Sequence, residues 1–375
     1  MTGISTNAIH ADQVLNRVTD VVPPINVTTT FRYPSNPNDI RPATDYQSDS
    51  YDPSSDTPIY SRLGHPNSTR VEKILSKLLD GEVIAYNSGL SAFFAAIMYF
   101  NPKTVAIGDG YHGCHGILNL LSRNYNVKIV NLDQLDQLKE GDLIHVETPE
   151  NPYSIVHDIE YYVNKAKSIG AKVLVDATFA PPPLSNPFDF GVDMIMHSAT
   201  KYFGGHSDLL AGCLITKDPK VKIQLATDRI FLGTNIANLE SYLLLRSLRT
   251  YELRIKQQSE SATKIVKYLV ENKNNYPTLD KIHHSSLQTE SFVLKQMKGG
   301  HSPVFSIELN EIEKAKSLPS KLKYFQHATS LGGVESLIEW RAVTDVNARK
   351  TLLRVSVGIE NVEDLISDLD QALRQ

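Results

Sequence analysis

The sequence predicts an α/β protein with a mostly parallel central sheet and a smaller C-terminal α+β domain. The chain has 375 residues, of which 41% are hydrophobic, enough for a large buried core and about two or three domains. From residue 71 onward, short apolar runs alternate with segments of helical spacing, a pattern typical of parallel sheets. From about residue 280, strand-like and helix-like segments are mixed, which indicates the smaller α+β domain.

The individual elements follow from the spacing of apolar residues. Helical spacing predicts helices over residues 71–80, 88–100 and 161–170. Short apolar runs predict buried strands over residues 104–110, 143–147, 172–177 and 193–199. Leucines at helical spacing predict a long helical region over residues 239–272. Beyond it, SPVFSIEL and LLRVSVGI predict strands, and VEDLISDLDQALRQ predicts a final helix.

The first 58 residues differ in composition from the rest of the chain. They lack long apolar runs and are rich in Pro, Asn, Asp, Ser and Thr, so the tract 33–58 predicts an irregular arm. Such an arm is either a disordered linker or a segment that wraps a partner subunit. We therefore expect an arm over residues 1–58, an α/β domain over 59–245 and an α+β domain over 246–375.

Composition excludes several classes of protein. The net charge is −4 and no basic block is present, which argues against a nucleic-acid partner. Cys114 and Cys213 are the only cysteines, which favours a reducing compartment. The first residues have no cationic flank leading into an apolar run, so a secretory signal is not expected. The apolar window 81–100 is interrupted by Asn87, Ser88 and Gly89, so no membrane span is expected. We expect a cytoplasmic protein.

The most informative segment is residues 192–208, which read VDMIMHSATKYFGGHSD. An apolar run ends in Ser198, Thr200 and Lys201. Hydroxyl groups donate hydrogen bonds to a phosphate, and a sheltered lysine forms an imine with an aldehyde. This combination indicates pyridoxal phosphate (PLP) as the cofactor. The ordinary alternative is a surface lysine beside turn hydroxyls, so the rest of a PLP site must be found elsewhere in the chain.

Suitable partners follow other predicted strands, at the sheet edge where α/β proteins bind ligands. Gly89 and Leu90 open the 88–100 helix, whose free N–H groups make an anion site; a plain helix cap is the alternative. Asp176 ends the strand KVLVD and can pair with a protonated pyridine nitrogen; a turn cap is the alternative. Tyr111 can stack on a flat cofactor or simply pack. Together these features favour a PLP site.

Two other chemistries are weaker. His112, Cys114 and His115 lie close in sequence, but no second cluster stands at zinc-ligand spacing, so no metal is expected. A serine hydrolase is disfavoured because the chain has no G-x-S-x-G motif.

Seven segments together resemble the Cys/Met-metabolism family of PLP enzymes, which includes cystathionine γ-synthases, γ-lyases and β-lyases. They are PIYSRLGHP, NSGLSA, ETPENP, LVDATFAPP, HSATKYFGGHSD, SLGGVESLI and LLRVSVGIE. The resemblance runs over nearly the whole chain from about residue 20, and HSATK with DATFA is highly specific. It implies the type I aminotransferase-like fold, an amino-acid substrate, and a homo-oligomer, dimer or tetramer, whose subunits share active sites. An arm that contacts the neighbouring subunit suits that assembly.

The resemblance also implies roles for particular residues. Lys201 matches the Schiff-base lysine, Asp176 the partner of the pyridine nitrogen and Tyr111 the stacking ring. The remaining cofactor positions are Gly89, Leu90, Ser198 and Thr200 for the phosphate, Tyr60 and Arg62 for the phosphate from the neighbouring subunit, Asn151 near the phenolic oxygen, and Thr178 beside the ring. Ser330 and Arg354 match the holders of the substrate α-carboxylate, which an arginine fork suits chemically.

Departures from the family pattern concern the substrate end of the site. The chain has GHPNS, YHGCH and RSL where GNPT, YGGT and RGL are usual, and EWRAVTD replaces a proline-and-histidine segment. We expect a carbon–sulfur lyase acting on a sulfur amino acid such as cystathionine, with Lys201 or Tyr111 removing the α-proton. Thr329, where many γ-acting members have a glutamate, favours β-elimination. The alternatives are γ-replacement or γ-elimination, and a cofactor-binding pseudoenzyme.

Overall fold

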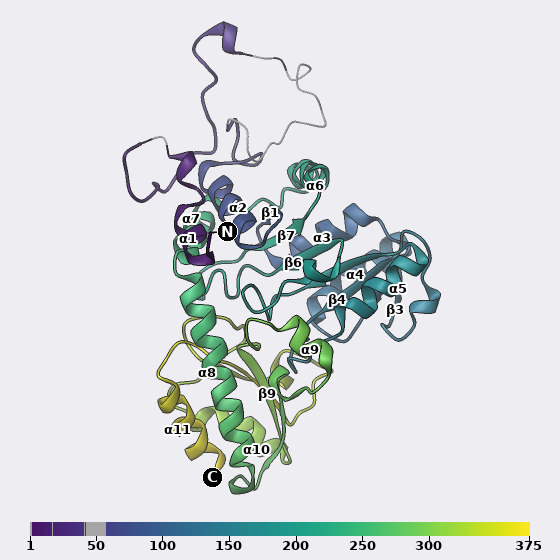
Figure 1. The fold of residues 1–375 in the computed structure, drawn as a ribbon, viewed down its shortest axis with the longest axis vertical. Coiled ribbons are helices and arrows are strands. Elements are labelled where there is room, and N and C mark those ends of the chain that lie inside the picture. The colour runs from purple at the N-terminus through teal and green to yellow at the C-terminus, as the bar shows by residue number, and fades with distance from the viewer. Residues whose placement is uncertain (1, 17, 41, 43–57) are drawn as a thin grey trace.

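The computed structural model describes residues 2–16, 18–40, 42 and 58–375. A large sheet with helices packed around it forms one end of the described chain, and a smaller sheet with its own helices forms the other (Figure 1). The long helix α8 (Tyr251–Glu271) runs beside the smaller sheet, with its first turns near the larger one. The architecture is therefore the predicted α/β domain followed by a smaller α+β domain.

The larger sheet has seven strands in the order β1-β7-β6-β5-β4-β2-β3. Their bounds are β1 (Glu82–Tyr86), β2 (Thr104–Ile107), β3 (Lys128–Val130), β4 (Leu143–Glu147), β5 (Lys172–Asp176), β6 (Met194–His197) and β7 (Gly212–Thr216). Strand β7 is antiparallel to β1 and β6, and the other pairings are parallel. The mostly parallel sheet predicted from the sequence is confirmed.

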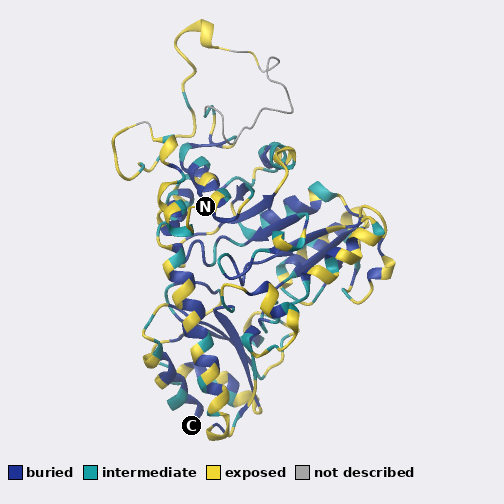
Figure 2. Cartoon of the chain, viewed as in Figure 1, coloured by how far each residue is buried: buried dark blue, intermediate teal, exposed yellow. Residues whose placement is uncertain are grey.

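Helices cover both faces of this sheet. They are α1 (Ile4–His10), α2 (Pro66–Leu78), α3 (Gly89–Phe100), α4 (His112–Tyr125), α5 (Ile159–Ile169), α6 (Pro219–Leu232) and α7 (Asn238–Leu248). Successive strand residues point to opposite faces: Val175 packs with residues of α2, α5 and α7, and Leu174 with residues of α3, α4 and α6. The sheet is accordingly mostly buried (Figure 2), and β2, β6 and β7 are buried along their whole length, which explains their apolar runs.

The C-terminal domain holds a five-stranded sheet in the order β10-β11-β12-β9-β8. Its elements are β8 (Leu279–His283), α9 (Ser291–Gln296), β9 (Val304–Leu309), α10 (Ile312–Ser317), β10 (Gln326–His327), β11 (Leu337–Trp340), β12 (Leu352–Ser356) and α11 (Val362–Leu373). All pairings except β10–β11 are antiparallel. The strands expected from SPVFSIEL and LLRVSVGI and the final helix are confirmed.

Several boundaries differ from the sequence prediction for local reasons. Helix α2 starts at Pro66 rather than residue 71, because His65 and Ser68 form a capping box with proline at the first turn. The helical region 239–272 is divided between α7 and α8 at Arg249 and Thr250, where Arg249 Nη1 donates to the carbonyl oxygens of Ala8 and Ile9, each at 2.7 Å. The expected domain boundary at residues 245 and 246 lies within α7 and stays a prediction.

The described start of the chain is anchored to the larger domain by a buried carboxylate. Asp12, 1% exposed, accepts hydrogen bonds from Arg70 at 2.9 Å and from Arg249 at 2.9 and 3.0 Å. These contacts hold α1 near α2 and α8. Most of the predicted arm tract, residues 41 and 43–57, lies outside the described residues, and its contact with a neighbouring subunit stays a prediction.

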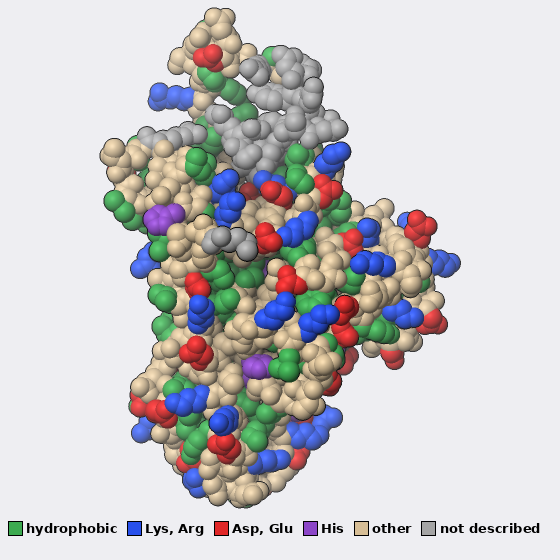
Figure 3. Space-filling model, viewed as in Figure 1, with side chains coloured by type: hydrophobic (Ala, Val, Ile, Leu, Met, Phe, Trp, Pro, Cys, Tyr) green, Lys and Arg blue, Asp and Glu red, His purple; other side chains and the backbone are tan. Residues whose placement is uncertain are grey.

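On the face shown in Figure 3, acidic and basic side chains are interspersed over the described part of the chain. Among the described residues, no helix combines the length and apolarity that crossing a membrane requires.

Candidate active site

The carboxyl ends of three adjacent strands bring the main candidate residues together. Glu147 ends β4, Asp176 ends β5, and Lys201 follows β6 by one tight turn. Glu147 and Asp176 are register partners in neighbouring parallel strands, so their side chains start side by side. This edge is where open α/β sheets bind ligands.

Lys201 lies in a sheltered position between the two domains. Its Nζ donates a hydrogen bond of 2.9 Å to Oγ of Ser330, a residue of the C-terminal domain. Burial, reinforced by the positive charge of Arg354, lowers the pKa of Lys201 to about 8, against the opposing charges of Glu339 and Asp176. The lowered pKa leaves more of the amine unprotonated near neutral pH than in an ordinary lysine, which suits Lys201 to act as a nucleophile towards an aldehyde and as a proton acceptor.

Ser330 reaches Lys201 through an unusual backbone conformation. Its φ is +80°, in the left-handed region that non-glycine residues seldom adopt. The following loop packs closely on the lysine turn, because a side chain at Gly332 would lie 2.9 Å from the backbone of Lys201 and Tyr202. The loop therefore aims both Ser330 Oγ and the Ser330 carbonyl into the site.

Asp176 is a buried carboxylate held by its own strand end. Thr178 donates to Asp176 Oδ1 from its backbone N at 2.9 Å and from Oγ1 at 2.6 Å, and Ser198 N donates to Thr178 Oγ1 at 2.9 Å. Burial raises the pKa of Asp176 despite these hydrogen bonds. A carboxylate desolvated in this way gains stability from a cationic N–H partner, as a protonated pyridine ring would supply.

Glu147 is a functional candidate that the sequence reasoning missed. Its Oε2 accepts the backbone N–H of Tyr111 at 2.6 Å, and its Oε1 accepts that of Asn151 at 2.9 Å. Burial and the adjacent Asp176 raise the pKa of Glu147. Glu147 thus fixes two loops that carry predicted cofactor residues. The signal was available, since LIHVE ends in a carboxylate just as KVLVD does.

The expected phosphate site lies at the start of α3. Ser88 caps the helix by accepting the N–H of Ser91 at 3.1 Å, and a side chain at Gly89 would lie 3.0 Å from Cβ and Oγ of Ser198. The helix start and the lysine turn thus approach as closely as glycine permits. The hydroxyl of Thr200 differs, because it exchanges hydrogen bonds with the backbone of Ala211.

Tyr111 stands at the N-terminus of α4 and is 38% exposed. A side chain at Gly113 would lie 2.5 Å from the Tyr111 ring and 2.9 Å from Leu90, so the tyrosine, the glycine and the leucine are close neighbours. Burial, then the charges of Cys114 and Glu147, raise the pKa of Tyr111. A raised pKa suits a neutral ring that covers a ligand better than it suits a base.

Arg354 joins the two domains opposite Lys201. Its guanidinium donates to Asn151 Oδ1 at 2.9 Å, to the Ser330 carbonyl at 3.0 Å and to Glu339 Oε2 at 2.5 Å. Burial lowers the pKa of Arg354 to about 10, against the charge of Glu339. Glu339 was not foreseen as a partner because its contact depends on the pairing of β11 with β12, where Glu339 lies opposite Arg354.

Tyr60 and Arg62 have other contacts. Arg62 donates to the carbonyl oxygen of Ile230 in α6 at 3.0 Å, and Tyr60 pairs with Thr30 of the N-terminal segment. Both residues are exposed. Within one chain, the structure does not join them to the Lys201 cluster.

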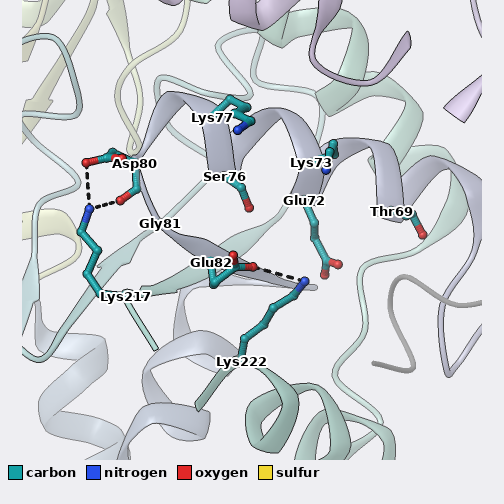
Figure 4. Close-up of a pocket in the computed structure, with 10 residues that line it drawn as sticks. All are labelled: Thr69, Glu72, Lys73, Ser76, Lys77, Asp80, Gly81, Glu82, Lys217 and Lys222. Atoms are coloured by element: carbon teal, nitrogen blue, oxygen red, sulfur yellow. Dashed lines mark hydrogen bonds and ion pairs between the residues drawn. The ribbon is translucent and has the colours of Figure 1, made fainter. Parts of the chain in front are cut away.

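A separate cavity of about 410 Å³ lies between α2, β1 and the start of α6 (Figure 4). Two of its four lysines face carboxylates: Lys217 approaches Asp80 at 2.8 Å and Lys222 approaches Glu82 at 3.4 Å. The cavity shares no residue with the Lys201 cluster and is distinct from the candidate active site.

The histidine and cysteine residues considered for zinc do not converge. Cys114 is buried, whereas His115 Nε2 lies 2.9 Å from the carbonyl oxygen of Gly108 and 2.7 Å from that of Asp109. In the described part of the chain, no group of three or more His, Cys, Asp or Glu side chains is arranged to hold a metal.

Known proteins resemble this chain along its whole length. Residues 5–374 match the family model of the Cys/Met metabolism PLP-dependent enzymes. Cystathionine γ-synthase of Escherichia coli is 35% identical, over 94% of this chain and 93% of that protein. Cystathionine γ-lyase of Saccharomyces cerevisiae is 34% identical, over 99% of this chain and 97% of that protein. Cystathionine β-lyase of Lactococcus lactis is 31% identical over 100% of both chains.

Comparison with solved structures finds proteins with the same kinds of name. The crystal structure of cystathionine γ-lyase from yeast aligns with a TM-score of 0.86 and 31% identity, covering 100% of this chain and 98% of that one. A cystathionine γ-synthase from Xanthomonas oryzae, in complex with aminoacrylate and cysteine, aligns with a TM-score of 0.87 and 27% identity, covering 100% of this chain and 98% of that one.

The fold and the site together define a PLP-dependent enzyme. The chain belongs to the Cys/Met metabolism family of PLP-dependent enzymes, as the sequence resemblance implied. The residues present are compatible with the cofactor: Lys201 would offer an amine to the aldehyde and Asp176 a buried carboxylate to the ring nitrogen, and the close approach of Gly89 to Ser198 leaves no room for a further side chain.

Proposed function

We propose that this chain is a carbon–sulfur lyase of the transsulfuration type, acting on a sulfur amino acid such as cystathionine, with β-elimination as the leading route. The observation that carries the proposal is that an amine of lowered pKa, a buried carboxylate and a buried arginine lie near one another at the carboxyl edge of the larger sheet. Lys201, Asp176 and Arg354 come from separate elements and two domains, yet Lys201 and Arg354 both bind Ser330, and the charges of Arg354 and Asp176 shift the pKa of Lys201.

Each residue has a defined task in this proposal. Arg354 and Ser330 would bind the substrate α-carboxylate, and Lys201 Nζ in its unprotonated form would accept the α-proton. When bound, PLP withdraws electrons from the substrate α-carbon through its protonated ring. Asp176 keeps the ring nitrogen protonated. Tyr111, held by Glu147, covers the ring and excludes water.

The cofactor end of the site has further members. Gly89, Leu90, Ser198 and Thr200 bind the phosphate, Asn151 lies near the phenolic oxygen, and Thr178 orients Asp176 beside the ring. Tyr60 and Arg62 serve the site of a second copy of the chain. Their exposure and their contacts with Ile230 and Thr30 support that assignment, because no hydrogen bond of the described structure joins either residue to the Lys201 cluster of its own chain.

The alternatives are γ-replacement or γ-elimination on cystathionine or an activated homoserine ester. Relatives named γ-synthase and γ-lyase support them as directly as the β-lyases support the leading route. Thr329, in place of the glutamate of many γ-acting enzymes, favours the β route. The YHGCH and EWRAVTD segments motivate a third reading, a pseudoenzyme that binds the cofactor without turnover.

Product analysis separates these functions. The PLP-loaded protein is incubated with cystathionine, cysteine and O-acylated homoserines, and the products are identified by mass spectrometry. Pyruvate with a released thiol is expected for β-elimination, 2-oxobutyrate marks γ-elimination, and a new thioether marks synthesis. Lys201→Ala should remove both the visible cofactor band and turnover. Turnover retained in Lys201→Ala would refute the assignment, and no turnover from the loaded native protein would favour the pseudoenzyme.

A further inference from the structure

Behind Arg354 lies a second buried guanidinium that the proposed mechanism does not use. Arg341, 2% exposed, begins the short turn after β11. Its Nη1 donates to Glu339 Oε2 at 2.9 Å, the same oxygen that accepts from Arg354 Nη2 at 2.5 Å. One carboxylate oxygen therefore joins two arginines, one of which faces the substrate.

The remaining contacts hold this arrangement rigidly. Thr344 Oγ1 donates to the other oxygen of Glu339 at 2.5 Å, and Arg341 Nη2 lies 3.3 Å from Asp345 Oδ2. Glu339 and Arg341 have side chains only 4% and 3% exposed, whereas that of Asp345 is 16% exposed. Glu339 thus accepts hydrogen bonds on both oxygens and cannot turn away from Arg354 without breaking several contacts.

The charges of the cluster decide what a substrate carboxylate meets. A pair of Arg354 and Glu339 alone would have no net charge and would attract an anion weakly. Arg341 adds a second buried positive charge. With Asp345 the four formal charges sum to zero, but solvent screens the more exposed Asp345, which therefore offsets Arg341 only in part. The influence of Arg341 extends further, since its charge lowers the pKa of both Arg354 and Tyr111, two residues on different sides of the site.

The two arginines also keep unused donors. The Nε–H groups of Arg341 and Arg354 are buried without a hydrogen-bond partner. Buried donors without partners cost free energy, so they commonly mark a place where another group binds. For Arg354 a carboxylate oxygen of the substrate is a suitable partner.

We propose that Arg341 is a positioning residue of the substrate-carboxylate site: by binding Glu339 it keeps Arg354 fixed and offsets the negative charge that Glu339 presents to the α-carboxylate. This inference rests on the proposed function, in which Arg354 holds that carboxylate. Arg341 acts through Glu339 rather than by touching the reacting atoms. It belongs to EWRAVTD, one of the segments where the chain departs from its family.

The test compares two unreactive amines that differ in the carboxylate. Glycine and glycinamide are titrated into the PLP-loaded enzyme, and binding is read from the change in the visible absorption band. Arg341→Gln should weaken the binding of glycine about tenfold, because one unit of charge is lost close to the bound carboxylate. Glycinamide, which lacks that charge, should change less than about twofold.

Two further variants sharpen the result. Arg341→Lys keeps the charge and should recover most of the glycine affinity. Asp345→Asn removes the offsetting charge from a partly exposed position and should tighten glycine about two- to threefold. It also keeps the proposal testable if Arg341→Gln does not fold. An unchanged cofactor band in each variant serves as the folding control.

The outcomes separate this inference from the proposed function. Equal weakening of glycine and glycinamide in Arg341→Gln, or no weakening of either, overturns the role of Arg341 while the lyase assignment stands. Failure of Asp345→Asn to tighten glycine also contradicts it. If the unsubstituted enzyme shows no response to either amine, the proposed function fails, and the role of Arg341 falls with it.

Discussion

Replacing Lys201 by methionine should stabilise the protein once PLP has been removed, although it removes the residue assigned to catalysis. Lys201 is buried beside Arg354 and carries a positive charge below its pKa of about 8. Methionine has a similar unbranched shape and no charge to desolvate. The variant therefore isolates what the buried amine costs the folded protein.

The magnitude follows from the pKa. Lowering it from 10.5 to about 8 corresponds to about 3 kcal/mol at pH 7, at 1.36 kcal/mol per pKa unit. Loss of the 2.9 Å hydrogen bond from Lys201 to Ser330 offsets about 1 kcal/mol of that gain. A net stabilisation of about 2 kcal/mol remains, which should raise Tm by a few degrees.

The gain should depend on pH in a defined direction. Below pH 8 the amine is charged in both the folded and the unfolded chain, so the full cost is present. Between about 8 and 10.5 the unfolded chain binds the proton and the folded chain does not, so the stability of the unsubstituted protein rises with pH. Above about pH 10.5 the advantage of Lys201→Met should vanish.

Thermal unfolding of the PLP-free proteins at pH 7 and pH 10.5, followed by circular dichroism at one scan rate, measures both effects. Lys267→Met is the matched control, because the Lys267 side chain is 74% exposed and its replacement should change stability by less than about 0.5 kcal/mol. A lower or unchanged Tm for Lys201→Met at pH 7 would refute the reasoning. A gain that persists at the higher pH would show that better packing, rather than charge, is responsible.

Two further substitutions test the scaffold of the site by thermal unfolding. Gly212→Ala places a methyl group against the carbonyl oxygen of Ser88, which caps α3 at the expected phosphate site. The substitution should therefore lower Tm and weaken PLP binding. Gly116→Ala, in open space on α4, should be neutral or more stable by up to about 1 kcal/mol, and equal behaviour of the two would contradict this account. Asp12→Ala leaves two arginines without their buried carboxylate and should cost about 3 kcal/mol. Asp39→Ala, in an exposed turn, is its control, and a loss no larger than that of the control would show that Asp12 does not anchor the start of the chain.

The sequence predicted, for a physical reason, that Asp176 and Lys201 lie at the ends of buried strands of the larger sheet. In a parallel sheet, ligands bind at the edge where the strands end. An apolar run and the polar residue that ends it are neighbours in the sequence, so both can be read from it. Asp176 and Lys201 could therefore be placed before the strands were known to be neighbours. Gly89 was recognisable in the same way, because the turn NSG follows the apolar run VIAY and opens a helix.

The parts that were missed depend on contacts between distant segments. Strands β1 and β7 are five-residue runs whose mutual pairing and antiparallel direction leave no local mark in the sequence. Glu339 meets Arg354 only because β11 and β12 pair in one particular register. A shift by one residue would turn Glu339 to the opposite face of the sheet. The sequence likewise gave no sign that Arg341 and Arg354 would both donate to Glu339.

This division of predictability coincides with a division of labour between the domains. Residues assigned to the cofactor come from strand ends and loops of the larger sheet. Ser330, Glu339, Arg341 and Arg354 come from the smaller one and reach the cofactor domain through Lys201 and Asn151. Substitutions in the smaller sheet can therefore alter which carboxylate-bearing substrate binds while the contacts of Asp176 and of the α3 start are unchanged. The departures in EWRAVTD lie on that side, so substrate choice should respond to them first.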